Sequence, residues 1–331
     1  TYGKMAMLID QIGSTEESLR YHRKSIALSQ SLVESAPKSL EYRQRLGLCH
    51  NNLAITLRRA GRVTEARQAY FDAIEVQRDS LDGGTSAIAK KITSDIVLSH
   101  TNLGLLQAET GEIHGAVSSF REAIRLQEGL LKNDSANPDL LRNLAATYNN
   151  LSAGYVKSDH AKAVECFQTA LAYLATAVKA APADQKLQRM LALTHTNYGS
   201  LRSQMREFKE AATSCDRAIE IQRKLVEAAP SRKIFRRDLV VSYNNRGMLH
   251  RKTGSPAKAE QSFQLALDLH RPLLTQYPND LDLQSKTGGV FNNLGFVLEK
   301  LKRDEDAAVA FKQAVEHQRI AFSQAPSVSD Y

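Results

Sequence analysis

A pair of polar side chains returns at a fixed interval along this chain of 331 residues. The second member of the pair is always Asn, and consecutive copies are 50, 48, 47, 48 and 48 residues apart. Asn is a poor residue for a helix interior because its amide competes for backbone hydrogen bonds, so six recurrences at one position require a physical cause. The amide can both donate and accept hydrogen bonds. The recurring residues are Asn52, Asn102, Asn150, Asn197, Asn245 and Asn293.

The first member of the pair varies between Asn and Thr. The pair is followed by a large residue and then a small one, so that residues 292–295 read Asn-Asn-Leu-Gly. Self-similarity at a period near 48 indicates a solenoid of stacked supersecondary units instead of separate globular domains. Asn holds the first position in Asn51, Asn149, Asn244 and Asn292.

Basic residues follow the pairs by one to two helical turns and share their surface. They are Arg58, Arg59, Lys157, Arg251, Lys252 and Lys300. Glu109 and Glu299 lie in the same region and oppose them. A net positive surface beside amides suits an acidic peptide or a C-terminal carboxylate. The alternative is a solvated helix end whose cations complement the carbonyl terminus.

The sequence gives little support for catalysis or for metal or cofactor binding. His50, His100 and His195 stand where other copies have Tyr or Phe, so we interpret them as packing rings. The cysteines lack a C-x-x-C pattern and a neighbouring His, which favours reduced core thiols. We therefore expect no catalytic residue, no metal and no cofactor. The cysteines are Cys49, Cys166 and Cys215.

Nucleic acid and membrane are not the expected partners. The net charge of +8 is spread over every unit. The basic run at residues 232–237 does not recur, and its Phe235 belongs to an apolar helix stripe, so a solvated helix start is favoured over an RNA-stacking platform. No apolar run is long enough to span a bilayer.

Each unit is expected to be a hairpin of two helices, A and B. In the clearest unit, helix A runs from about Ser231 to Lys252 and helix B ends before Pro278. Gly254 can turn left-handed between them, and Ser255-Pro256 supplies an N-cap and a first-turn Pro. The small residue of helix A is matched by a small–large–small pattern in helix B, which lets the two helices approach closely.

The predicted units span approximately residues 1–37, 38–84, 85–137, 138–181, 182–229, 230–277 and 278–325 of one array, with 326–331 starting a further helix. The junction at residues 82–84 is longer by two residues, and Asn137 is expected to cap the helix that Pro138 begins. The chain opens in the second half of an A helix, which suggests a piece of something longer. A terminal B helix at residues 307–325 should expose an apolar stripe and favour self-association.

The positions just described resemble the tetratricopeptide repeat over essentially the whole chain. The Leu-Gly/Ala pair of helix A is followed by Ala, Phe or Tyr, Ala and Pro at repeat positions, as in residues 294–295 and Ala307, Phe311, Ala314 and Pro326. The departure is length, about 48 residues instead of the usual 34. The long form also resembles the C-terminal arrays of planctomycete-type bacterial serine/threonine kinases, although this chain carries no kinase motif.

The resemblance implies an all-α, right-handed α-solenoid of about seven hairpins that binds proteins. In such arrays helix A lines the concave groove, and the amide at the Asn position holds the backbone of an extended peptide. The alternative is that each amide bonds the neighbouring repeat and sets the superhelical twist.

We therefore expect a non-catalytic interaction scaffold for a protein or peptide, acidic ligands among them, as the recruitment region of a larger signalling protein such as a bacterial kinase. Its expected location is the cytoplasm, or outside it if a membrane span precedes Thr1. A structural, self-assembling array and an RNA-binding helical repeat are the two alternatives; RNA binding would fall steeply with added salt.

Overall fold

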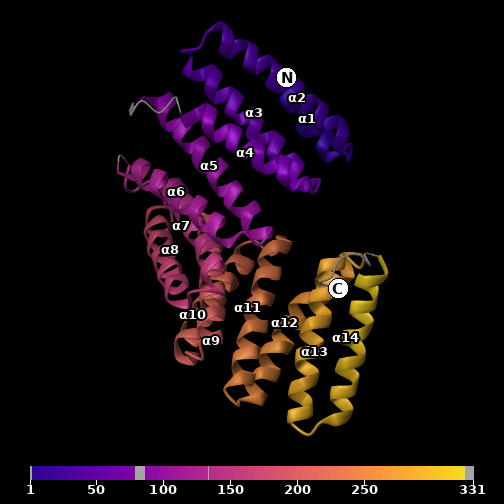
Figure 1. Cartoon of the computed structure of the whole chain (residues 1–331). Coiled ribbons are helices and arrows are strands. Elements are labelled where there is room, and N and C mark those ends of the chain that lie inside the picture. Colours follow the sequence, from indigo (N-terminus) through magenta and orange to yellow (C-terminus); the bar gives the residue numbers. More distant parts are fainter. Residues whose placement is uncertain (1, 79–85, 133, 325–331) are drawn as a thin grey trace. The chain divides into compact units, whose positions relative to one another are not determined.

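The computed structural model describes residues 2–78, 86–132 and 134–324, and within them it contains fourteen α-helices and no strand (Figure 1). The chain divides into two compact parts, Thr1–Ala180 and Ala181–Tyr331, which we describe separately. The longer junction predicted at residues 82–84 and the further helix predicted at 326–331 lie outside the described residues. No described helix is long and apolar enough to cross a membrane.

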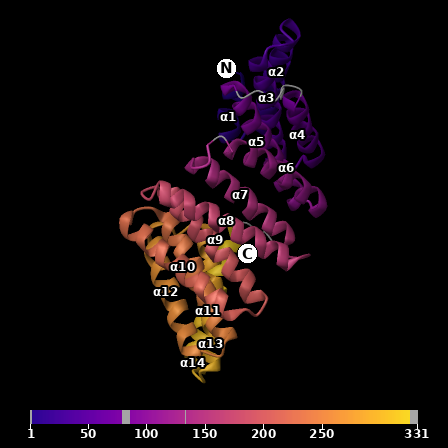
Figure 2. The same ribbon diagram turned by 90° about the vertical axis from the view of Figure 1, so that its left-hand side faces the viewer.

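The N-terminal part contains four hairpins, whose A and B helices alternate along the chain (Figure 2). Their bounds are α1 Tyr2–Gln11, α2 Thr15–Ser35, α3 Leu40–Arg59, α4 Val63–Arg78, α5 Ala87–Glu109, α6 Ile113–Leu131, α7 Pro138–Tyr155 and α8 His160–Ala180. Odd-numbered helices are A helices and even-numbered ones are B helices.

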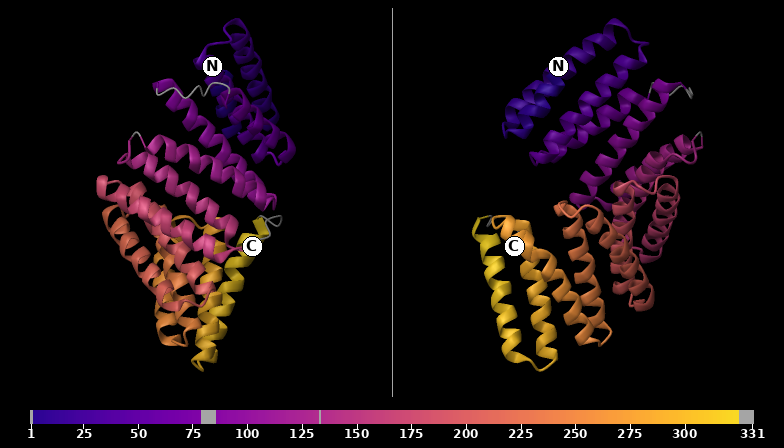
Figure 3. Two further views of the ribbon diagram at one scale, coloured as in Figure 1. Left: turned by 60° about the vertical axis from the view of Figure 1, so that its left-hand side comes forward. Right: turned by 180° about the vertical axis from the view of Figure 1, so that it is seen from behind.

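The C-terminal part contains three hairpins. Helices α11 to α14 stand side by side in the right-hand view of Figure 3. The bounds are α9 Gln185–Gln204, α10 Phe208–Ala228, α11 Lys233–Lys252, α12 Pro256–Gln276, α13 Leu281–Lys300 and α14 Asp304–Gln324. Helix α11 begins two residues later than expected, with Arg232 at its N-cap.

Close contact between a Gly of helix A and a Phe of helix B holds each of several hairpins together. A Cβ on Gly247 would lie 2.5 Å from the ring of Phe263, and one on Gly295 would lie 2.6 Å from Phe311. Real Cβ atoms do not approach other atoms this closely, so only Gly fits without a shift. The expected small-against-large packing of the two helices is confirmed.

The turns between A and B helices use the left-handed backbone conformation. Gly61 and Gly254 have φ of +73° and +70°. Asn137 caps α7 as expected, because its Oδ1 accepts from the backbone N–H of Asp139 and Leu140 at 3.0 and 3.1 Å. Ser255 occupies the N-cap of α12, although its side chain accepts no capping hydrogen bond.

Within each part, A helices lie closer together than B helices. Among the described residues, each A helix approaches the next A helix of its part to within 8 Å between Cα atoms, whereas no B helix approaches the next B helix this way. Successive B helices are therefore spread apart, and the A helices form the inner layer of each part.

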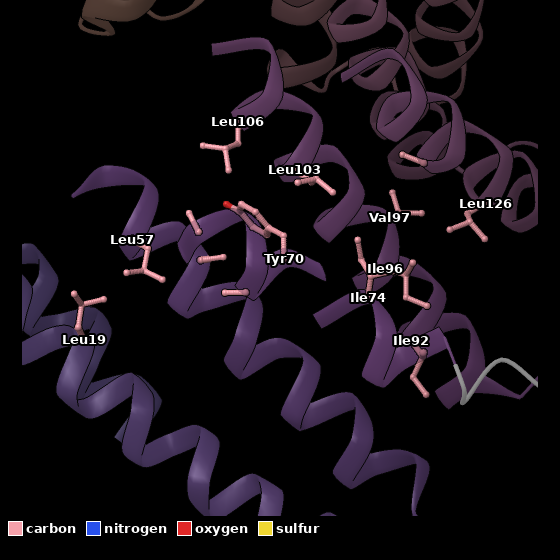
Figure 4. Close-up of a cluster of buried hydrophobic side chains, with 14 residues drawn as sticks. Leu19, Leu57, Tyr70, Ile74, Ile92, Ile96, Val97, Leu103, Leu106 and Leu126 are labelled. Carbon is pink, nitrogen blue, oxygen red and sulfur yellow. The ribbon is translucent and has the colours of Figure 1, made fainter. Parts of the chain in front are cut away.

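Within each part, a buried hydrophobic cluster extends through more than one hairpin. In the N-terminal part, Leu19 of α2, Leu57 of α3, Tyr70 of α4, Ile92 of α5 and Leu126 of α6 belong to one buried cluster (Figure 4). Within this cluster, α4 packs both against α3 of its own hairpin and against α5 of the next hairpin. This arrangement places the Asn pairs on the inner layer of A helices.

Candidate functional site

The Asn pairs form hydrogen bonds between successive A helices at two steps. The Oδ1 of Asn51 on α3 accepts from the Nδ2 of Asn102 on α5 at 3.4 Å. The Oδ1 of Asn244 on α11 accepts from the Nδ2 of Asn293 on α13 at 3.0 Å. The first position of one repeat thus binds the second position of the next repeat, which is a structural role for these amides.

Where the first position is Thr, this link is absent. The hydroxyl of Thr101 donates to the carbonyl of Val97 at 2.8 Å, and that of Thr196 bonds the carbonyl of Ala192 at 3.0 Å and the hydroxyl of Ser242 at 2.8 Å. The Asn of the following repeat in the first case is Asn150, and in the second it is Asn245. Neither amide has a hydrogen-bond partner among the residues that the structure describes.

Three of the remaining predicted Asn residues are also unlinked. In the described ranges 2–78, 86–132 and 134–324, Asn52, Asn197 and Asn292 make no side-chain hydrogen bond either, and the side chain of Asn197 is exposed. Asn149 lies on α7 and is half-buried. The series of recurring Asn residues, which we call the Asn ladder, therefore contains amides that are linked between repeats and amides that are not.

Several amides of the C-terminal part surround one cavity of about 220 Å³, which we call the amide pocket. Its walls come from the A helices α9, α11 and α13. Its lining residues include Gly199, Ser200, Ser203, Cys215, Asn244, Asn245, Met248, Leu249, Lys252 and Asn293. Gly199 of α9 and Cys215 of α10 line the part that we call its floor, and Cys215 stands where most other repeats have Phe.

Two of the predicted basic residues are neutralised in the N-terminal part. Arg58 forms a bidentate pair with Glu109 on the next A helix, one of whose hydrogen bonds measures 2.8 Å. Arg59 pairs with Asp10 on the preceding A helix at 2.6 Å. Lys157 is exposed beyond the end of α7. Arg58 and Arg59 therefore act as inter-repeat links in this structure.

The C-terminal part keeps its positive charge near the amide pocket. The Nζ of Lys252 lies 3.2 Å from the Oγ of Ser203, and the guanidinium of Arg251 lies over the ring of Phe296 at 5.8 Å. Among the described residues, Arg251, Lys252 and Lys300 form no ion pair with a carboxylate. Glu299 adjoins them and is exposed. Of these charged residues, Lys252 is the one that lines the pocket.

Other reactive groups are buried and inactive at neutral pH. Burial lowers the pKa of His100 to about 4, with a smaller raising effect from Glu122. Burial raises the pKa of the Cys166 thiol to about 11 and that of Cys215 to about 11 as well. No group of His, Cys, Asp or Glu within the described ranges could hold a metal ion. Cys215, which lines the amide pocket, is therefore a protonated thiol at neutral pH.

Sequence reasoning missed the residues that shape the pocket. Met248, Ser203 and the Gly199–Cys215 floor come from three helices, and no single-repeat pattern marks them. One signal was present: within each part, Thr in place of Asn at the first position, as in Thr196, marks the repeat whose successor keeps an unlinked amide.

Three further cavities lie between successive B helices and were also missed. They measure about 270, 400 and 420 Å³. Each is lined by the aromatic residue that precedes the Asn pair on the intervening A helix, namely Tyr148, Tyr243 or Phe291. They are a consequence of the spread of the B helices.

Comparison with known proteins identifies the repeat. A family model described as tetratricopeptide repeat matches residues 48–82, and a second with the same description matches 98–129 and 240–271. No curated protein matches the sequence.

Among the similar solved structures, RapI supports the fold. The apo form of RapI has a TM-score of 0.59 at 9% identity, and the match covers 97% of this chain and 98% of that one. BtubC (BKLC) from P. vanneervenii has a TM-score of 0.49 at 17% identity, covering 95% and 93%. MamA has a TM-score of 0.37 at 18% identity, covering 66% and 95%. At 9% identity, the likeness to RapI concerns the fold alone.

Proposed function

Because this chain is an array of tetratricopeptide repeats, we propose that it is a non-catalytic protein-interaction scaffold whose amide pocket binds an extended peptide. The observation that carries the proposal is Asn245. Its amide lines the pocket and has no hydrogen-bond partner in the described part of the chain. An amide offers one acceptor and two donor hydrogens, which matches the N–H and C=O of a peptide backbone.

The other lining groups suit a peptide with mixed side chains. Met248 and Leu249 supply apolar contact area, and Met adapts to irregular shapes. The Nδ2 of Asn293 donates a hydrogen bond to the Oδ1 of Asn244 at 3.0 Å, so this wall of the pocket is formed before a ligand binds. A preformed wall reduces the entropy lost on binding.

The charge of this face favours an acidic partner. Arg251, Lys252 and Lys300 have no carboxylate ion pair among the described residues, so their charges are available to a ligand. A carboxylate on the peptide would gain charge-assisted hydrogen bonds here, and the attraction would also speed association. Short acidic segments are therefore the proposed ligand class.

A purely structural ladder is the second candidate, and a specific observation favours it. Asn51 with Asn102 and Asn244 with Asn293 are satisfied by each other. If every amide served this role, the array would have defined twist and no peptide affinity. The two hypotheses differ in the role of the unlinked Asn150 and Asn245, which bind a ligand in the first hypothesis and bind none in the second.

The test starts from short random peptides displayed on phage and selected on the whole chain. A selected peptide is then titrated by fluorescence anisotropy against the wild type, Asn245→Ala and Asn244→Ala. We expect Asn245→Ala to weaken binding about tenfold, since it removes hydrogen bonds worth about 1 kcal/mol each, and to leave the melting temperature unchanged. Asn244→Ala should lower stability by about 1 kcal/mol because it breaks an inter-repeat bond.

A second pair of variants tests whether binding requires the positive charge beside the pocket. Lys252→Gln should weaken an acidic peptide and reduce the salt dependence of its affinity, whereas Lys258→Gln, the same charge change on the outer helix α12, should do neither. Selection of no peptide, or equal binding by wild type and Asn245→Ala, would support the structural ladder. Binding of a single-stranded RNA probe with a steep salt dependence would support the nucleic-acid alternative.

The resemblance to kinase-linked arrays supports a place for this scaffold as the recruitment region of a larger signalling protein. In that role the array would raise the local concentration of a bound partner beside a catalytic domain.

A further inference from the structure

The cavity of about 270 Å³ in the N-terminal part lies between the B helices α6 and α8, over the A helix α7, and we call it the α6–α8 cavity (Figure 2). Among the described residues, α6 and α8 do not approach each other within 8 Å between Cα atoms, so side chains of α7 are reached between them. Its volume is just below the range of about 300–1,000 Å³ usual for ligand pockets, which suits a ligand the size of one amino acid.

One part of the α6–α8 cavity, which we call its floor, is apolar and is lined by Ile124, Tyr148 and Leu151. The hydroxyl of Tyr148 donates to the Oε1 of Glu128 at 3.0 Å, and its ring stacks on that of Tyr173 with 5.9 Å between the centroids. Because two partners hold this ring, the floor is a preformed surface for an aromatic or aliphatic side chain.

Two opposite charges line the same cavity from different B helices. Arg121 lies on α6, Glu165 lies on α8, and both are exposed. Neither forms an ion pair within the part of the chain that the structure describes, and the guanidinium of Arg121 lies over the ring of Tyr155 at 6.0 Å. Burial is the largest cause of the raised pKa of the Cys166 thiol, to which Glu165 adds and which Arg121 opposes. Both charges therefore act on one thiol of the lining without neutralising each other.

A third charged residue of the lining is already paired. The Nζ of Lys162 lies 2.8 Å from the Oδ2 of Asp159, which precedes α8 by one residue. The charge of Lys162 is therefore compensated. One cation, Arg121, and one carboxylate, Glu165, remain for a ligand in this cavity.

This combination of charges occurs at one step of the array only. At every other step, the two equivalent positions on successive B helices lack one or both charges. The packing of the hairpins therefore does not require Arg121 and Glu165. The equivalent pairs are Arg23 with Gln68, Phe71 with Ser118, Gln168 with Thr213, Asp216 with Gln261 and Gln264 with Val309.

A free α-amino acid matches this arrangement. Its ammonium and carboxylate groups are attached to one carbon atom, and its side chain leaves from the same atom. The interior of a peptide has neither charge, and each end of a peptide has one. Charge-assisted hydrogen bonds to both Arg121 and Glu165 from one small cavity therefore favour the free amino acid over a peptide segment.

We propose that the α6–α8 cavity binds a free α-amino acid with an aromatic or large aliphatic side chain. Arg121 holds the carboxylate, Glu165 holds the ammonium group, and the side chain lies on the floor beside Tyr148. The cavity shares no residue with the amide pocket, which lies in the other part of the chain, so the inference is independent of peptide binding there.

The test is equilibrium dialysis of L-tryptophan against the whole chain. The chain contains no Trp, so the tryptophan fluorescence reports the ligand alone. N-acetyl-L-tryptophan lacks the ammonium group and L-tryptophan amide lacks the carboxylate, and each should bind at least about tenfold more weakly than L-tryptophan. Isothermal titration calorimetry with L-phenylalanine and L-leucine covers the smaller side chains.

Two variants assign the charges. Arg121→Gln and Glu165→Gln should each weaken L-tryptophan binding at least about tenfold. Arg121→Gln should not weaken L-tryptophan amide any further, because that ligand lacks the group that Arg121 holds. Glu165→Gln should likewise not weaken N-acetyl-L-tryptophan any further. A general effect on the fold would not produce this crossed pattern.

Matched controls lie on the same helix. Arg125 and Glu122 of α6 form an ion pair at 2.7 Å and do not line the cavity. Arg125→Gln and Glu122→Gln should leave binding of L-tryptophan within about twofold of the wild type. Asn245→Ala in the amide pocket should also leave it unchanged.

Three results would overturn the proposal. One is that the chain binds none of the three amino acids. Another is equal binding of L-tryptophan and its two derivatives, which would indicate apolar adsorption without recognition of charge. The third is loss of L-tryptophan binding in Asn245→Ala but not in Arg121→Gln, with both variants folded by far-UV circular dichroism.

Discussion

At the scale of single residues, two positions hold a backbone conformation that other repeats assign to Gly. Arg206 and Lys302 have φ of +64° and +62°, in the turns that follow α9 and α13. Gly254 has φ of +70° at the equivalent turn after α11. A side chain with a Cβ is disfavoured there, by about 1–2 kcal/mol per residue.

Arg206→Gly should therefore stabilise the protein by about 0.5–1 kcal/mol, after the entropy that a Gly adds to the unfolded chain is subtracted. Urea denaturation followed by circular dichroism measures the change. Arg206→Ala is the control, because it removes the same side chain and keeps the strained conformation. An equal gain from both variants would show that the arginine side chain, and not the backbone, is responsible.

At the scale of elements, each hairpin depends on how closely its two helices approach. Gly247 lies against Phe263, and an added Cβ would meet the ring at 2.5 Å. Gly199 lies against Cys215, and an added Cβ would meet its Sγ at 3.2 Å. The hairpin that contains Cys is therefore packed less tightly at this point, where Gly199 and Cys215 line the amide pocket.

Gly247→Ala should lower the free energy of unfolding by about 2 kcal/mol, because the methyl group overpacks a filled core. Gly199→Ala should cost less than about 1 kcal/mol, since a contact at 3.2 Å is relieved by a small shift. Thermal and urea unfolding of both variants provide the comparison. The cost of Gly247→Ala should also fall in a Phe263→Leu background, and full additivity of the two substitutions would contradict direct contact as the cause.

At the scale of the whole molecule, the histidines whose pKa falls furthest are His100 in the N-terminal part and His195 and His270 in the C-terminal part. Burial lowers the pKa of each to about 4, and nearby cations add to the effect at His195 and His270. The unfolded chain has ordinary histidines with a pKa near 6.5 and so takes up protons first on acidification. The stability that these groups contribute is present above about pH 6.5 and is lost as the pH falls from about 6.5 towards about 4.

His270→Gln should make the loss of stability between about pH 7 and about pH 5 smaller, by up to about 1.4 kcal/mol per pH unit for one histidine. Gln is suited to this position because Gln77, Gln127 and Gln222 occupy it in other repeats. Urea unfolding at several pH values measures the slope. The exposed His160→Gln serves as the control, and an equal change of slope in both variants would refute the role of burial.

The sequence by itself determined the repeating hairpin, because every signal involved is local and returns in each copy. The periodic apolar stripe, the Gly of each turn and the small–large pairing of Gly247 with Phe263 require only one repeat to be read. The aromatic position of His100 and the cap at Asn137 were predictable for the same reason.

Only the tertiary structure decided which amides are linked and which cations are neutralised. Asn244 and Asn245 are neighbours in the sequence, yet one bonds the next repeat and the other opens into a pocket. Arg58 and Arg251 hold equivalent positions, but one meets Glu109 and the other lies over Phe296. These outcomes depend on the register between successive A helices, where residues about 50 positions apart meet at hydrogen-bond distance, and no local pattern specifies such a distance.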